Sequence, residues 1–312
     1  MTTPSSFTFT LDPGQVAKLR ERLEEQGFAF SELPYGHFRA ERKEKKVGVQ
    51  AYLSGKLLVQ GKGAAELVEF LIEPEIVGEA RLGYDAVHHP EHFEPHLGID
   101  ESGKGDFFGP LVVAGVYTDG ETARRLLEAG IKDSKLIGSD KRAKELAEAV
   151  REIVGPRCTV ITMNPEKYNE LHGKFRNLNR LLAWGHATTI ENLLTAIPHC
   201  PRAVSDQFAN PAILQRALKE RGKKIELVQR TKAESDVAVA AASILARAEF
   251  LLRLEKLGDQ IGRALPKGAS AAVLALAKEI HAKQGEEALA RVAKRHFRTF
   301  AQACGHPLPE AE

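Results

Sequence analysis

The sequence lacks the features that mark several specialised classes of protein. Its 312 residues include only three cysteines (Cys158, Cys200 and Cys304), with no Cys-x-x-Cys pair, so we expect reduced thiols rather than disulfides or a zinc site. No run of eighteen apolar residues occurs, so we expect no transmembrane helix. The first ten residues show no basic segment followed by an apolar core, so we expect no secretory signal and a cytoplasmic protein.

A strong charge imbalance and a nucleotide-binding loop are also missing. The formal net charge is only +2, and 43% hydrophobic with 28% charged residues is ordinary for a globular protein. No Gly-x-x-x-x-Gly-Lys-Ser/Thr loop occurs, so a nucleoside triphosphatase is not supported. The length allows one large domain, or a small domain followed by a medium one.

Residues 1–75 predict a small α+β domain. An alternating segment at Phe7–Leu11 is typical of a strand, and Asp12-Pro13 predicts the start of a helix that Gly27 ends. Several short strands and a second helix follow, with Ser54-Gly55 as a hairpin turn. We place the strands at 28–30, 38–43, 47–53 and 56–60, and the helix at 63–72.

A local basic stripe interrupts this otherwise acidic region. Residues 39–62 hold seven basic side chains against two acidic ones. The basic residues are Arg39, Arg42, Lys43, Lys45, Lys46, Lys56 and Lys62. Such a stripe either follows the phosphates of a nucleic acid or covers a solvated hairpin, and the sequence leaves both open.

Residues 76–95 are expected to form a linker, since this region is rich in proline and glycine. Histidines crowd its end at positions 88, 89, 92 and 96. Because neither cysteine nor regular helical spacing accompanies them, we favour a solvated linker over a metal site.

Residues 96–304 predict an α/β domain with a central sheet, because strand-like and helix-like segments interleave. We expect Glu166–Leu194 to be mostly helical and Ser270–Cys304 to form one or two amphipathic helices. The remaining residues, 305–312, are expected to form a frayed tail.

The most informative stretch is Leu97–Pro110, where an apolar strand delivers Asp100 and Glu101 to a glycine-rich turn. Adjacent buried carboxylates repel one another unless a cation compensates them, so a metal ion is the natural partner. A solvated surface turn is the alternative. Gly103 and Gly105 permit a positive φ and close approach of another backbone.

Two further acidic positions follow in the chain. Asp206 ends a short apolar strand, and residues 231–236 place Glu234 and Asp236 before a helix. Because ligands gather at strand ends in α/β sheets, converging carboxylates would suit two divalent ions about 3.5–4 Å apart. Spacing alone does not establish that they converge.

Several motifs occur together in the order typical of one family. They are the stretch 98–111, Lys132-Asp133-Ser134-Lys135, the block 174–179 with Trp184-Gly185-His186, and Lys232-Ala233-Glu234 leading to Ala240-Ala241-Ala242-Ser243. The first closely resembles the first motif of the bacterial ribonuclease HIII family, and the likeness extends over most of residues 97–304.

The resemblance implies a ribonuclease H-like fold and two Mg²⁺ or Mn²⁺ ions that assist water in cutting the RNA strand of an RNA–DNA hybrid. The products would carry 5′-phosphate and 3′-hydroxyl ends. Asp100, Glu101 and Asp206 would be metal ligands. Glu234 occupies the place of the fourth ligand, with Asp236 as a nearby rival.

The resemblance also suggests residues that contact the substrate. The turn Gly103-Lys104-Gly105, with Ser102, would approach the 2′-hydroxyl and phosphate groups that distinguish RNA from DNA. Lys135, Asn177 and Asn179 are further candidates, although helix capping or a helix-face position would equally explain the two asparagines.

The N-terminal domain is similar to the extra domain of this family, which resembles one half of the TATA-box-binding protein. This likeness implies a sheet face that grips the hybrid. Candidate contacts are Arg39, Lys43, Lys45 and Lys46, with Tyr35 and Phe38. Phosphate contacts of this kind give affinity without sequence preference. We expect a monomer with no obligate protein partner.

Two other functions compete with this interpretation. One is incision at single embedded ribonucleotides, as in ribonuclease HII, and the other is hybrid binding without catalysis. The N-terminal domain and the lysine of Gly103-Lys104-Gly105 favour type HIII, and the retained carboxylates argue against a catalytically silent protein.

Overall fold

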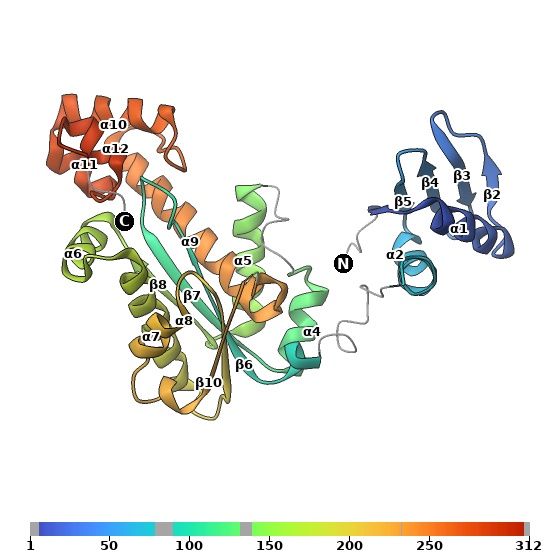
Figure 1. Ribbon diagram of the computed structural model, residues 1–312, viewed down its shortest axis with the longest axis horizontal. Helices are drawn as coiled ribbons and strands as arrows, with labels where there is room; N and C mark the ends of the chain where they lie inside the picture. Colours follow the sequence, from blue (N-terminus) through green and yellow to red (C-terminus); the bar gives the residue numbers. More distant parts are fainter. Residues whose placement is uncertain (1–5, 79–89, 132–138, 232, 309–312) are drawn as a thin grey trace. The chain divides into compact units, whose positions relative to one another are not determined.

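The computed structural model describes residues 6–78, 90–131, 139–231 and 233–308 (Figure 1). The chain divides into two compact units, Met1–Pro90 and Glu91–Glu312. Among the described residues, no helix combines the length and the apolar character needed to cross a membrane.

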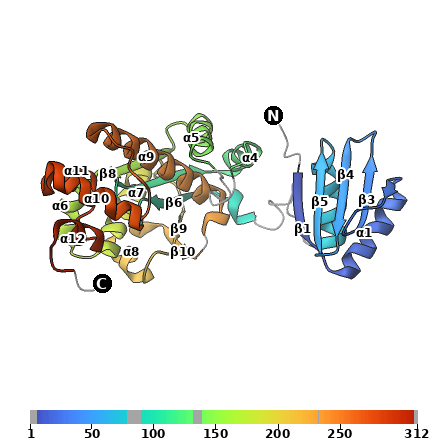
Figure 2. The ribbon, with the colours of Figure 1, turned by 90° about the horizontal axis from the view of Figure 1, so that it is seen from above.

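The N-terminal unit is an antiparallel five-stranded sheet with helices on one face (Figure 2). The strand order is β1-β5-β4-β3-β2. The strands are β1 Ser6–Thr10, β2 Ala29–Ser31, β3 Gly36–Arg42, β4 Val47–Tyr52 and β5 Lys56–Gly61, and the helices are α1 Pro13–Glu25, α2 Ala64–Leu67 and the π-helix η1 Val68–Val77. Helical backbone therefore continues past residue 75, where the sequence places the end of this domain.

Local sequence explains how α1 begins and what it covers. Asp12 caps the helix: its Oδ1 accepts the Gln15 N–H at 2.8 Å, and the Gln15 side chain accepts the Asp12 N–H at 3.0 Å. Val16, Leu19 and Leu23 are buried at helical spacing against the sheet. The alternating burial of β3, β4 and β5 leaves the opposite sheet face open.

The second unit is built on a mixed five-stranded sheet with the order β10-β9-β6-β7-β8, as the sequence predicts for an α/β core. Strand β6 pairs in parallel with β9 and antiparallel with β7, and β9 pairs in parallel with β10. The strands are β6 His96–Ser102, β7 Leu111–Thr118, β8 Cys158–Met163, β9 Arg202–Asp206 and β10 Glu226–Arg230.

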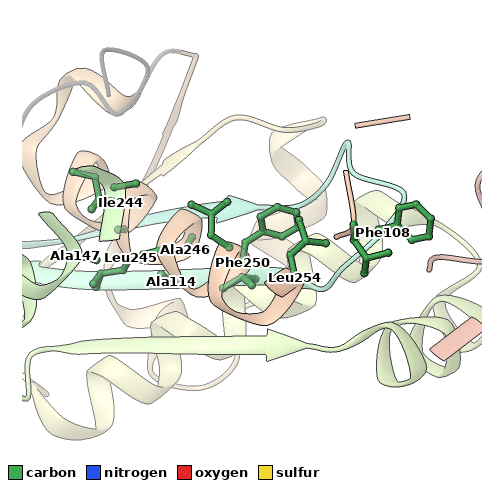
Figure 3. Packing of buried hydrophobic residues seen from close by; sticks show 14 of the residues in the cluster. Phe108, Ala114, Ala147, Ile244, Leu245, Ala246, Phe250 and Leu254 are labelled. Carbon is green, nitrogen blue, oxygen red and sulfur yellow. The ribbon is translucent and has the colours of Figure 1, made fainter. Parts of the chain in front are cut away.

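Helices cover both faces of this sheet (Figure 1). One face packs against α4 Gly120–Glu128, α5 Asp140–Val154 and α9 Val237–Ile261; the other packs against α6 Pro165–Phe175, α7 Leu178–Ala196 and α8 Pro211–Ala217. Figure 3 shows the first core, where Ala114 of the sheet lies beside Leu245, and Phe250 and Leu254 of α9 extend the core towards Phe108.

Helix α9 crosses β6 at unusually close range. A Cβ atom on Gly98 would lie 2.1 Å from the carbonyl carbon of Ala238. Small residues in the first half of α9, which includes Ala241 and Ala242, allow this approach. The start of α9 is thereby fixed against the strand that carries Asp100.

The prediction that residues 166–194 are mostly helical is confirmed, whereas the prediction of one or two helices in residues 270–304 is wrong. The first region holds the two helices α6 and α7, because Arg176 adopts a left-handed conformation (φ 52°) and Asn177 caps α7 by accepting the Arg180 N–H at 3.0 Å. The C-terminal region holds three helices, α10 Ala271–Gln284, α11 Glu286–Val292 and α12 Arg298–Cys304. Gly285 (φ 85°) and the extended Ala293 separate them.

Candidate active site

Asp100 and Asp206 come off neighbouring parallel strands at the same end of the sheet. The register pairs Ile99 of β6 with Ser205 of β9, so the following residue of each strand is one of the two aspartates. Parallel strands present their carboxyl ends at one edge, where ligands bind in α/β sheets. The fold brings together these two carboxylates, which lie more than one hundred residues apart in the sequence.

Asp100 has a strongly perturbed carboxyl group. Burial, with the neighbouring Glu101 carboxylate, raises the pKa of Asp100 to about 8; the hydrogen bond with Ser243 acts in the opposite direction, and Asp206 adds a smaller repulsion. A carboxylate held this way is costly to ionise alone and is stabilised by a cation.

Glu234 lies in a short 3₁₀ turn, η5 Ala233–Ser235, which contacts β9. The Ala233 N–H donates to Oδ1 of Asp206 at 3.1 Å, which docks the turn onto the end of β9. Glu234 is half-buried at this position.

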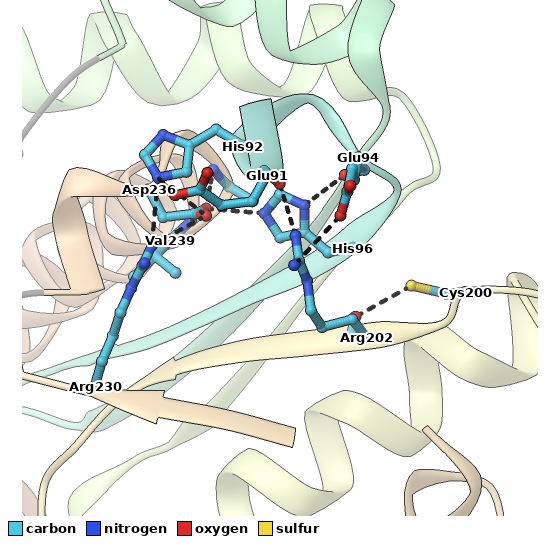
Figure 4. Close-up of polar contacts among 10 residues, drawn as sticks. Glu91, His92, Glu94, His96, Cys200, Arg202, Arg230, Asp236 and Val239 are labelled. Atoms are coloured by element: carbon cyan, nitrogen blue, oxygen red, sulfur yellow. Dashed lines mark hydrogen bonds and ion pairs between the residues drawn. The ribbon is translucent and has the colours of Figure 1, made fainter. Parts of the chain in front are cut away.

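Asp236, the other candidate for the fourth ligand, makes contacts with the start of α9, with His96 and with Arg230 (Figure 4). It caps α9, where its Oδ1 accepts the Ala238 N–H at 2.9 Å, and it bonds His96 Nε2 at 3.0 Å. Arg230 lies 3.5 Å from its Oδ2. Burial alone would raise the pKa of Asp236, but the His96 hydrogen bond and the charges of His96 and His92 hold it below its usual value.

The same network corrects the interpretation of the linker histidines. His92 and His96 are buried, only 6% and 0% exposed, and both face Asp236 rather than solvent. Positions 88 and 89 lie outside the described residues. His92 lies in the 3₁₀ turn η2 Pro90–Phe93, which precedes β6.

The four candidate ligands fit a hard divalent cation by the chemistry of their donors, since all are carboxylates. Their oxygen atoms do not form a tight cluster. In the described part of the chain, one group of three candidate ligands has all its ligand atoms within 4.8 Å of one another: Glu286, Cys304 and His306, elsewhere in the domain. An open arrangement suits Mg²⁺, which takes few protein carboxylates and keeps waters and substrate oxygens.

The glycine-rich turn follows directly from β6. Gly103 has a φ of 90°, and a Cβ there would lie 2.3 Å from the Pro110 carbonyl oxygen, so both conformation and space require glycine. Ser102 and Lys104 are half-buried and Gly105 is exposed. The Lys104 ammonium lies 5.9 Å from the centre of the Phe208 ring, just beyond Asp206.

Residues before α10 and around the end of α11 contact the segment that follows this turn. Lys294 is fully buried and donates to the Asp106 carbonyl at 2.6 Å, while the Asp106 carboxylate accepts the Gly268 N–H at 2.6 Å. Gly109 donates to the Val292 carbonyl at 2.9 Å. We call these three contacts the C-terminal clamp.

The remaining predicted contacts are dispersed. Lys135 lies outside the described residues, Asn177 caps α7, and Asn179 is half-buried in the first turn of that helix. In the N-terminal unit, Arg39 lies on the open sheet face and pairs with Glu41.

Other N-terminal candidates lie at the ends of the strands. Lys43, Lys45 and Lys46 are exposed between β3 and β4, and Lys45 reaches Glu66 of α2 at 2.5 Å. Tyr35 is 89% exposed and available for contacts. The suggestion of Phe38 is wrong: it is buried in the core, because its side chain points to the helix-covered face of β3.

His186 belongs to one of the sequence motifs, but the motif alone assigns it no role. In the structure, His186 of α7 bonds Glu101 Oε2 through Nε2 and Ser205 Oγ through Nδ1, both at 3.0 Å. The sequence feature that could have indicated this role is a histidine within the apolar segment 181–190 of a helix that packs on the sheet.

Comparison with known proteins gives one consistent result. Residues 97–300 match the family model "Ribonuclease HII", and residues 6–80 match "Domain of unknown function (DUF3378)". The chain is 45% identical to ribonuclease HIII of Chlamydia caviae over 97% of this chain and 98% of that protein. It is 44% identical to ribonuclease HIII of Protochlamydia amoebophila over 96% and 97%.

Solved structures agree. The crystal structure of Bst-RNase HIII in complex with Mn²⁺ matches with a TM-score of 0.66 and 32% identity, covering 96% of this chain and 98% of that one. The crystal structure of Aquifex aeolicus RNase H3 matches with a TM-score of 0.53 and 29% identity, covering 92% and 98%. Together with the two-unit architecture and the carboxylates at the sheet edge, these matches show that the chain belongs to the ribonuclease HIII family of metal-dependent ribonucleases.

Proposed function

We propose that this ribonuclease cuts the RNA strand of RNA–DNA hybrids at the edge formed by β6 and β9, leaving 5′-phosphate and 3′-hydroxyl ends. The observation that carries the proposal is the parallel pairing of Ile99 with Ser205, which sets Asp100 beside Asp206. Glu101 and Glu234 complete the set of four carboxylates.

These carboxylates would hold two Mg²⁺ or Mn²⁺ ions. When bound, the ions would activate the attacking water and stabilise the leaving oxygen of the phosphodiester. The chain itself orients the ligands: Ser243 and the Glu101 N–H hydrogen-bond Asp100, and the Ala233 N–H holds Asp206. Lys104 supplies a cation beside the site for a backbone phosphate.

The N-terminal unit would bind the hybrid through its open sheet face and the hairpin between β3 and β4. Support comes from exposed Tyr35, from Arg39 on the open face, and from the exposed lysines 43, 45 and 46. Such contacts would give affinity without sequence preference.

A metal-dependent cleavage assay tests the proposal, with RNA–DNA, RNA–RNA and DNA–DNA duplexes compared under identical salt. We expect cleavage of the RNA–DNA hybrid alone. A DNA duplex with one embedded ribonucleotide, beside one with four or more, separates this activity from ribonuclease HII-like incision. Binding of hybrid without any product in Mg²⁺ or Mn²⁺ would contradict an enzymatic role.

We also propose that the protein acts as a cytoplasmic monomer. The three cysteines are all free thiols, which is consistent with a reducing compartment. Light scattering coupled to gel filtration tests the oligomeric state: a mass near 34.2 kDa is expected, and a stable dimer would contradict it.

A further inference from the structure

A buried histidine connects two of the strands that build the active site. His186 lies in the middle of α7 and is 0% exposed. Its Nε2 lies 3.0 Å from Glu101 Oε2, and its Nδ1 lies 3.0 Å from Ser205 Oγ. One ring therefore contacts Glu101 of β6 and the residue preceding Asp206 in β9.

The direction of the Glu101 hydrogen bond follows from the partners. An ionised carboxylate only accepts, so Nε2 carries the hydrogen that points to Glu101. If the ring is neutral, Nδ1 accepts from the Ser205 hydroxyl. If the ring is charged, Nδ1 donates to that hydroxyl, which then donates to the Asp206 carbonyl 3.1 Å away. In both states Nε2–H donates to Glu101.

Packing fixes the plane of the ring. Phe208 lies against it, with ring centres 4.8 Å apart and planes inclined by 56°. Phe208 also lies 5.9 Å from the Lys104 ammonium. The histidine is thus held from the Ser205 side and from the Phe208 side, so its Nε2 has little freedom to move away from Glu101.

We propose that His186 is a positioning residue for Glu101. It holds one carboxylate oxygen and thereby presents the other oxygen towards Asp100 and Asp206. This inference rests on the proposed role of Glu101 as a metal ligand. Residues that orient metal ligands by hydrogen bonds typically change metal affinity 10- to 100-fold when removed.

Two substitutions separate positioning from packing. In His186→Gln the amide nitrogen replaces Nε2 and still reaches Glu101, whereas in His186→Asn the shorter amide replaces Nδ1 and reaches only Ser205. Both are polar, smaller than histidine, and leave a void beside Phe208. A purely structural role therefore predicts similar behaviour of the two variants, with Asn only slightly worse.

The measurement is Mn²⁺ binding to the full chain without substrate, by calorimetry, together with kcat and KM on an RNA–DNA hybrid. For His186→Asn we expect about 10- to 100-fold weaker Mn²⁺ binding and lower kcat, with unchanged KM for the hybrid. His186→Gln should stay within about threefold of the parent protein. Parent-like Mn²⁺ affinity in folded His186→Asn, or equal losses in both variants, would overturn the inference.

A second measurement needs no change at His186. With ¹⁵N-labelled histidine, Glu101→Gln should move an Nε2 resonance of one buried histidine, and the absence of any shift would overturn the contact. A different variant tests the proposed function separately. If Asp100→Asn bound Mn²⁺ as tightly as the parent protein, the proposed metal site would be wrong, independently of the role of His186.

Discussion

The backbone N–H of Ala233 donates to Oδ1 of Asp206 at 3.1 Å. This bond joins the end of β9 to the turn that carries Glu234 and precedes α9. The acidic positions that are separated in the sequence are therefore joined by backbone as well as by sheet pairing.

Removing one charge from the site should abolish cleavage without unfolding the protein. Asp206→Asn keeps an oxygen that accepts the Ala233 N–H but loses the negative charge, and Asp100→Asn removes the carboxyl that burial disfavours in its ionised form. We expect cleavage to fall by at least about 10³-fold, the equivalent of about 4 kcal/mol, with hybrid binding retained. Substantial turnover in either variant would remove that residue from the metal site.

Glu234 and Asp236 should respond in opposite ways. Glu234→Gln should lose cleavage and keep its melting temperature. Asp236→Asn keeps an oxygen that can cap α9 but loses the buried charge that faces His96 and Arg230, so we expect a loss of about 1–3 kcal/mol in stability, with cleavage by the folded protein retained. Thermal melts and cleavage rates of both variants test this; the reverse pattern would identify Asp236 as the fourth ligand.

Deleting residues 1–90 should mainly weaken hybrid binding, since these residues form their own compact unit. The slope of log K against log salt should become shallower by about 0.9 for each phosphate that the truncated protein no longer neutralises. Binding isotherms at several salt concentrations measure this, with kcat as the control. A truncated protein that binds as tightly at physiological salt would show that the unit does not hold substrate.

Gly98→Ala should destabilise the protein, because the added methyl group would collide with the Ala238 backbone. We expect a loss of about 1–3 kcal/mol in the free energy of unfolding. Gly173→Ala is the matched control: nothing lies within 4 Å of its Cβ position in α6, so the same substitution should stabilise by up to about 1 kcal/mol. Equal urea midpoints for the two variants would contradict the close crossing of α9 over β6.

Lys294 should make the free energy of unfolding depend on pH between about 7 and 10.5. Burial lowers the pKa of Lys294 from 10.5 to about 7, with a smaller opposing effect from Asp106. Between these values the unfolded chain holds a proton that the folded chain lacks, so this residue's contribution to stability increases as pH rises from 7 towards 10.5. The increase is at most about 1.4 kcal/mol per pH unit.

Urea unfolding of the parent and of Lys294→Met at about pH 7, 8 and 9 tests this prediction. The stability difference between them should move in favour of the parent as pH rises. Parallel curves would mean that Lys294 keeps its proton in the folded state.

The sequence predicted the parts of the site that depend on local pattern. Strand-like runs ending in Asp100 and Asp206, interleaved with helices, indicated an α/β sheet with carboxylates at its edge, and the parallel pairing of β6 and β9 places these two residues side by side. The predictions of the metal ions and of the substrate came from the family resemblance.

The sequence could not assign roles that depend on partners far along the chain. An aspartate before a helix is equally typical of a cap and of a ligand, and only the contact with His96, 140 residues away, shows that Asp236 is occupied. His186 and Glu101 are 85 residues apart, so their bond leaves no local pattern. Phe38 faces the core because of the register of β3, which residue type alone does not reveal.

The C-terminal clamp also has a consequence for the order of synthesis. Lys294 follows Asp106, the residue it contacts, by 188 positions, so the ribosome makes the strands that carry the candidate ligands long before the residue that holds the following turn. A nascent chain that already carries Asp100, Asp206 and Glu234 would still lack a fixed loop at Lys104. We therefore expect the protein to stay inactive on the ribosome until residues 292–294 have left the exit tunnel.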